Sequence, residues 1–248
     1  MQVSGRLPRI GVGFVRGKKD ALHPLICAGA RRRAVTRERD GATSASADPY
    51  GHGVDRTAPW ALVSASAAPV VLIGGWTVAA SRQPDGYSSV RGTISALAAH
   101  GATDRWIMTA ALYGLGTCHV ITASGLRSAR TPGRALLAVG GVATAVAAAF
   151  PQPEVGGSWA HTAGATASFL ALGAWPAFAG DRTSPAVLLR TRNAVLGSAA
   201  LLALVSWYST ELNGDRKGFS ERVAASAEAL WPLATAASAW MARRRTRA

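Results

Sequence analysis

Long apolar segments separated by short polar breaks make up most of the chain after residue 59. A helix rises about 1.5 Å per residue, so about 20 apolar residues cross the roughly 30 Å hydrocarbon layer of a membrane. In water, a chain of 248 residues could not bury so many helices that are apolar on all sides. We therefore predict an all-α fold, a six-helix transmembrane bundle. Its spans are Trp60–Ala80, Trp106–Leu126, Arg134–Phe150, Trp159–Ala179, Arg192–Tyr208 and Val223–Met241.

The first 58 residues lack this pattern, since no helical or strand period persists there over a useful length. We expect residues 1–58 to be a disordered basic cytoplasmic tail. A gene-start artefact is the alternative, because translation from a valine codon near Val35 or Val54 would remove most of the segment. The predicted domains are this tail, a six-span transmembrane domain over residues 59–242 and a basic cytoplasmic C-terminus over residues 243–248.

Charge is scarce and mostly positive. Charged residues make up 16% of the chain, against about 25% in an average soluble domain, and the net charge is +14. Arginine supplies 24 of the 27 basic residues, which we interpret mainly as codon composition. No basic motif interleaved with aromatic residues accompanies it, so we expect no nucleic-acid partner. The expected partner is the lipid bilayer; composition leaves the oligomeric state open.

Tryptophan and arginine give the predicted arrangement in the membrane. Seven of the eight tryptophans lie near predicted span ends, where the indole ring prefers the membrane interface. The loops and the C-terminus on one side hold ten Lys/Arg, against six on the other. The positive-inside rule therefore predicts both termini in the cytoplasm of a multi-pass protein of a bacterial cytoplasmic (plasma) membrane. The seven tryptophans are Trp60, Trp76, Trp106, Trp159, Trp175, Trp207 and Trp240.

Two local patterns predict how the helices and one loop pack. In the loop over residues 81–105, the apolar positions Val90, Ile94, Leu97 and Gly101 recur at helical spacing. They predict a short interfacial helix on the outer membrane surface, or else a re-entrant element without a ligand, which we favour. Small residues at four-residue spacing in the third and fourth spans predict close packing of these helices against their neighbours. These residues are Gly140, Thr144 and Ala148, then Gly164 and Ser168.

The candidate functional residues are polar groups within or next to the spans, where ionisable side chains are costly and often functional. Glu221 and Glu228 are seven residues apart and share one helix face. We expect His161, Glu221 and Arg222 to meet near the outer membrane face, with Glu228 deeper and Arg222 paired with a carboxylate. The ligand-binding candidates are Tyr87, Ser95, Asp104, Arg105, His161, Glu221, Arg222 and Glu228; other polar neighbours are His100, His119, Glu154, Glu211 and Asp215.

Several functions fit such a cluster. It could be a structural network, an outward-facing pocket for a lipid headgroup or small ligand, or the centre of a membrane-embedded, metal-assisted lipid hydrolase. The hydrolase has little support, since no two histidines lie three or four residues apart and no HExxH motif occurs. A small transporter lacks the paired interrupted spans typical of that class. We favour a non-enzymatic pocket, and we assign no catalytic residue, metal or cofactor.

Several stretches together resemble the bacterial six-span family catalogued as domain of unknown function 998. The resemblance covers about three quarters of the chain and implies an integral membrane protein without an assigned reaction. Ala96 departs from the family, whose similar loop often carries an acidic residue there. The matching stretches are Pro69-Val-Val-Leu-Ile-Gly-Gly-Trp76, Tyr87-Ser-Ser-Val-Arg-Gly-Thr-Ile-Ser-Ala-Leu97, Asp104-Arg-Trp-Ile-Met108, His161 and Gly218-Phe-Ser-Glu-Arg222.

Overall fold

The computed structural model describes residues 57–153 and 155–245, and this part of the chain is all-helical. Residues 1–56 of the predicted N-terminal tail and the last three residues lie outside the described residues. All six predicted spans are helices, and their bounds agree with the prediction to within a few residues at most ends. The elements are α1 (Pro59–Ser81), α2 (Ile94–Leu97), α3 (Trp106–Gly125), α4 (Thr131–Ala149), α5 (Trp159–Ala179), the 3₁₀ turn η1 (Val187–Leu189), α6 (Thr191–Thr210) and α7 (Lys217–Arg245).

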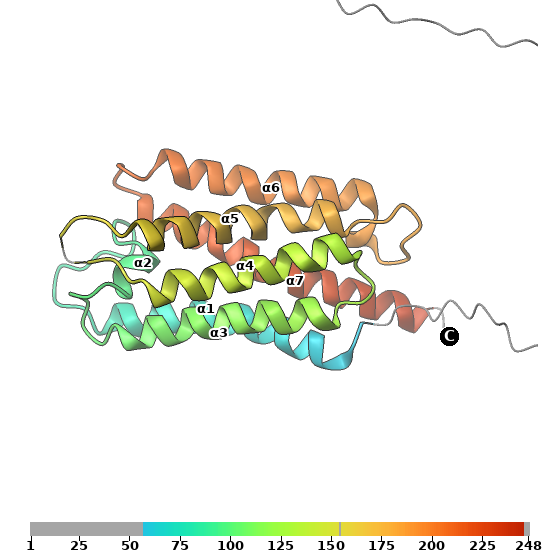
Figure 1. Ribbon diagram of the computed structural model, residues 1–248, viewed down its shortest axis with the longest axis horizontal. Coiled ribbons are helices and arrows are strands. Elements are labelled where there is room, and N and C mark those ends of the chain that lie inside the picture. Colours follow the sequence, from blue (N-terminus) through green and yellow to red (C-terminus); the bar gives the residue numbers. More distant parts are fainter. Residues whose placement is uncertain (1–56, 154, 246–248) are drawn as a thin grey trace, which may run out of the picture. The chain divides into compact units, whose positions relative to one another are not determined.

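The long helices run side by side, and their connections alternate between the two ends of the bundle (Figure 1). α2 and the loops before α3, α5 and α7 lie at one end. The turn η1 and the C-terminal end of α7 lie at the other. α7 packs against α1, α3, α5 and α6, as well as against α2 and η1. Polar groups on α7 are therefore surrounded by protein along much of its length.

Four helices in the described residues, α1, α3, α4 and α6, are long and apolar enough to cross a membrane. Their outward faces carry large apolar side chains that the bundle leaves uncovered, including Val63 and Val70, each 70% exposed. A soluble monomer rarely exposes apolar surface on such a scale. The fold is therefore of the membrane type. α5 and α7 are as long but do not meet the same criterion, and α7 carries Glu221 and Glu228 within its length.

Small residues bring α4 against its neighbours, as their spacing predicts. A Cβ atom on Gly164 of α5 would lie 2.9 Å from the backbone nitrogen of Ala147 on α4. The Thr144 and Ser168 hydroxyls join the same two helices through a 2.7 Å hydrogen bond. On the other side of α4, a Cβ atom on Gly116 of α3 would overlap the Gly141 carbonyl oxygen. Only side chains this small permit such approach.

The predicted interfacial position of Trp175 is wrong. Trp175 lies near the end of α5, but it is completely buried in an apolar cluster with Leu137 and Leu172. Trp60, Trp106 and Trp159 are exposed near helix ends, as an interfacial belt requires. Sequence position alone could not separate the two groups, because the ring of Trp175 faces the bundle.

The predicted interfacial helix is also corrected. α2 is a single turn, with the Thr93 side chain accepting a hydrogen bond from the Ala96 N–H at its start. Ile94 and Leu97 are buried against the bundle, whereas Val90 is 49% exposed. The four apolar positions therefore do not form one helical face. The segment packs into the end of the bundle because Ile94 and Leu97 complete an apolar cluster between α1 and α3.

Candidate functional site

Glu221 is a buried carboxyl group at the α2 end of the bundle. It lies in the first turns of α7 and is 3% exposed. The backbone N–H of Ile94 donates to its Oε2, and the Ser95 hydroxyl donates to its Oε1 over 3.4 Å. The single turn of α2 thus presents two donors to one carboxyl group. This contact links residues 127 positions apart in the chain.

The environment of Glu221 controls its protonation. Burial raises the pKa of Glu221 to about 7, while the donors from Ile94 and Ser95 and the charge of Arg222 act in the opposite direction. Burial is the largest effect because the carboxyl group has left water without a direct ion pair. A carboxyl group with this pKa changes its charge near neutral pH.

Arg222 binds backbone carbonyl oxygens, whereas the sequence predicted that it would pair with a carboxylate. Its Nη1 donates to the carbonyl oxygens of Ser89 and Gly92, each over 2.7 Å, and to that of Gly218 over 2.9 Å. Its Nη2 donates to the Tyr87 hydroxyl over 3.0 Å, and the guanidinium lies 5.8 Å from the ring centre of Trp76. Arg222 therefore fastens the loop before α2 to α7. It positions the donors of Glu221 without facing the carboxyl group itself.

His161 lies in the first turn of α5, which the Ser158 side chain caps by accepting from the His161 N–H. The imidazole is 3% exposed, and its Nδ1 lies 2.9 Å from the Ala147 carbonyl oxygen on α4. A carbonyl oxygen can only accept, so Nδ1 carries the hydrogen. In the neutral ring, Nε2 is then a free acceptor.

Two adjoining hollows bring these groups together. The first, here called the end pocket, has a volume of about 820 Å³ and lies between the α2 loop, α5 and α6. The second, the inner cavity, has about 60 Å³ and lies deeper in the bundle. Ser95, His161 and Glu221 line both, so the inner cavity adjoins the end pocket at this point. Of the three residues predicted to meet, His161 and Glu221 line the same two hollows, whereas Arg222 lines neither.

Glu228 lies in the inner cavity, two turns along α7 from Glu221. It is 2% exposed, and its Oε1 has no hydrogen-bond partner among the described residues. This oxygen faces α5 at Gly173, where an added Cβ atom would lie 3.4 Å away. A buried carboxyl oxygen without a partner costs free energy unless something occupies the space beside it.

Other predicted residues lie apart from these hollows. Asp104 is exposed just before α3, with a backbone φ of 49°. Arg105 lines a separate shallow depression with His100. His119 is fully buried on α3, and neither ring nitrogen has a partner among the described residues. Glu154 lies outside the described residues. Tyr87, unlike these residues, lines the end pocket.

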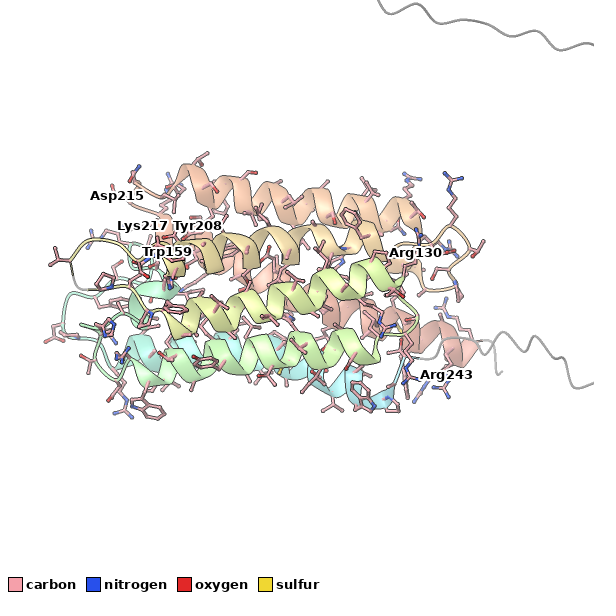
Figure 2. All side chains as sticks on the ribbon, in the orientation of Figure 1. Arg130, Trp159, Tyr208, Asp215, Lys217 and Arg243 are labelled. Carbon is pink, nitrogen blue, oxygen red and sulfur yellow. The ribbon has the colours of Figure 1, made fainter. Side chains whose placement is uncertain are left out.

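The hollows also contain residues that the sequence did not single out as ligands. Lys217 and Tyr208 line the end pocket, and Figure 2 shows both at the same end of the bundle, with Asp215 nearby. Thr144 and Ser168 line the inner cavity. Their four-residue spacing with glycines indicated close helix packing, which the structure confirms. It did not indicate that they also line a cavity. Lys217 carried a weak signal as the only lysine after residue 19.

No group of three or more His, Cys, Asp or Glu side chains suited to a metal ion occurs in the described part of the chain. His161, Glu221 and Glu228 share the inner cavity without converging on one point. The arrangement offers hydrogen-bond acceptors and carboxyl groups to a ligand, in surroundings that are largely apolar.

The fold and the hollows define an all-helical bundle with membrane-type helices and a buried polar site at one end. The chain belongs to the family described as protein of unknown function (DUF998), whose model matches residues 66–238. Neither a curated protein nor a solved structure matches the chain.

Proposed function

We propose that the protein crosses the membrane six times, with both termini in the cytoplasm, and binds a phospholipid in the end pocket at the outer face. The observation that carries the proposal is the end pocket itself. It combines buried polar groups with an apolar flank that is open to the surface of the bundle.

Six crossings would include α5 and α7, the two long helices besides α1, α3, α4 and α6. α5 has 21 residues and α7 has 29, which are sufficient lengths to span a bilayer. Their polar residues His161, Glu221 and Glu228 are buried against other helices, so they need not contact lipid. A membrane helix tolerates ionisable groups on such an inward face. The lower apolar content of α7 is then in part a consequence of the carboxyl groups that it holds.

The distribution of basic residues supports the proposed orientation. Arg127, Arg130 and Arg134 lie at or next to the connection between α3 and α4, and Arg243–Arg245 end α7. Figure 2 shows Arg130 and Arg243 at the end of the bundle opposite Tyr208 and Lys217. With this arginine-rich end in the cytoplasm, the end pocket faces outward.

A phospholipid fits both the polar and the apolar parts of the site. The polar groups of the end pocket lie beside Leu170 and Leu212, which are half exposed on α5 and after α6. A shallow, mainly apolar groove continues from the pocket along α5 and shares Thr162, Thr166 and Leu170 with it. A headgroup in the pocket would place an acyl chain along this groove, in contact with the bilayer.

Filling the pocket tests the proposal. Ala165 lines both hollows, so Ala165→Phe should occupy the space of the headgroup. Ala199→Phe adds the same side chain at an exposed position of α6 and is the matched control. We expect native mass spectrometry of detergent-purified protein to show bound phospholipid on the wild type and on Ala199→Phe. Ala165→Phe should lose most of it with unchanged helical circular dichroism. Equal retention by a folded Ala165→Phe variant would reject the proposal.

A further inference from the structure

The inner cavity contains six polar side chains, and their hydrogen bonds can be traced individually. Thr144 donates its one hydroxyl hydrogen to the Gly140 carbonyl oxygen over 2.9 Å. In the hydrogen bond between Thr144 and Ser168, Ser168 is therefore the donor. The Ser95 hydroxyl donates to Glu221. Every hydroxyl hydrogen in the cavity is therefore already used.

The carboxyl and imidazole groups add further acceptors. His161 uses its Nδ1 hydrogen on Ala147, which leaves Nε2 as an acceptor in the neutral ring. Ionised Glu221 and Glu228 can only accept, and the Glu228 Oε1 has no partner among the described residues. With both carboxyl groups ionised, the cavity offers free acceptors but no free side-chain donor. A group with several N–H donors and a positive charge would complement such a cavity.

We propose that the inner cavity binds a primary ammonium group at Glu228, with Glu221 and the Nε2 of His161 lining the same cavity. This inference rests on the proposed lipid binding and specifies the headgroup. An ammonium group has three donors and no acceptor, which complements the free acceptors of the cavity. The cavity volume of about 60 Å³ suits so small a group. A trimethylammonium group is larger and has no N–H donor.

The end pocket supplies a partner for the rest of such a headgroup. Lys217 lines the end pocket but not the inner cavity. A phosphate in the end pocket could pair with Lys217 while the ammonium group occupies the inner cavity. This order of charges matches an aminophospholipid with a phosphoethanolamine headgroup. The same ammonium chemistry also occurs in free ethanolamine, and an experiment can separate the two sources.

The test compares headgroups that differ only in N-methylation. Wild-type protein is placed in nanodiscs of phosphatidylglycerol mixed equally with phosphatidylethanolamine and phosphatidylcholine, and bound lipid is identified by native mass spectrometry. We expect phosphatidylethanolamine to be retained about tenfold over phosphatidylcholine, since methylation removes every donor from the charged nitrogen. Glu228→Gln keeps the side-chain shape and should abolish this preference. Asp215→Asn removes an exposed carboxylate at the same end and should retain it.

A second arm distinguishes the source of the ammonium group. Free ethanolamine is added to protein in phosphatidylcholine discs, and thermal stability is measured. Stabilisation that Glu228→Gln abolishes would assign the cavity to a soluble amine, whereas lipid selectivity without this effect assigns it to a headgroup. Equal retention of both lipids, or a preference that survives Glu228→Gln, would overturn the ammonium proposal. If Ala165→Phe still displaced lipid in that case, the proposed function would stand; absence of any retained lipid would reject both.

Discussion

At the scale of single residues, Glu221 makes the stability of the protein dependent on pH. Its folded-state pKa of about 7 exceeds the ordinary value of 4.5, so the folded protein binds this proton more tightly than the unfolded chain does. The free energy of unfolding should therefore fall as pH rises from about 4.5 to about 7, by on the order of 2–3 kcal/mol, and change little above that range.

Thermal unfolding in detergent between these pH values measures this effect. Glu221→Gln cannot titrate, so its melting temperature should decline less with pH than that of the wild type. Asp215→Asn, an exposed carboxylate at the same end of the bundle, should follow the wild-type profile. Parallel profiles for the wild type and Glu221→Gln would show that burial does not perturb this group.

The sequence could predict some of these residues because membrane burial leaves few options for a carboxyl group. Seven-residue spacing puts Glu221 and Glu228 on one face of α7. A carboxyl group in contact with lipid is costly, so this face must point into the bundle. The partners of Arg222 were beyond prediction, since they are carbonyl oxygens in the loop before α2, more than 120 residues away. Tyr208 and Lys217 were missed for a similar reason: only the packing of α6 and α7 brings them to the pocket.

At the scale of helices, the approach of α3 to α4 depends on glycine. Gly116→Ala should destabilise the protein, because the added Cβ atom overlaps the backbone carbonyl oxygen of Gly141 and the two helices must separate. We expect a loss of about 1–3 kcal/mol despite the higher helix propensity of alanine. Gly74→Ala is the control, since no atom outside its own helix lies within 4 Å of its added Cβ. Thermal unfolding of both variants measures the difference, and equal melting temperatures would contradict it.

The long helices were predictable because a soluble protein of this size could not bury so many long apolar segments. The bounds of α2 were not predictable, because only two of the four apolar positions at helical spacing lie in this helix. Ile94 and Leu97 lie one turn apart and are buried, but Val90 belongs to the preceding turn of loop and Gly101 to the loop that follows. Thr93 caps the start of α2, after the turn that contains Val90. A four-residue helix carries too few positions for periodicity to define it.

At the scale of the whole molecule, orientation decides which side of the membrane the end pocket faces. All the connections at the α2 end lie on one side if the six long helices all cross. The connection between α5 and α6 then lies on the other side, with the C-terminus. The account therefore links the number of spans, the position of the termini and the accessibility of the pocket. One observation at each end tests whether α5 crosses and which side the pocket faces.

Single cysteines labelled in intact cells provide this test most directly. In a background with Cys27→Ser and Cys118→Ala, Gly157→Cys lies in the loop before α5, where no neighbouring atom lies within 4 Å of an added Cβ. Arg182→Cys lies at an exposed position in the loop after α5. A membrane-impermeant maleimide should label position 157 in intact cells and position 182 only after permeabilisation. Labelling of position 182 but not 157 in intact cells would reverse the orientation, and labelling of both would contradict a membrane-spanning α5.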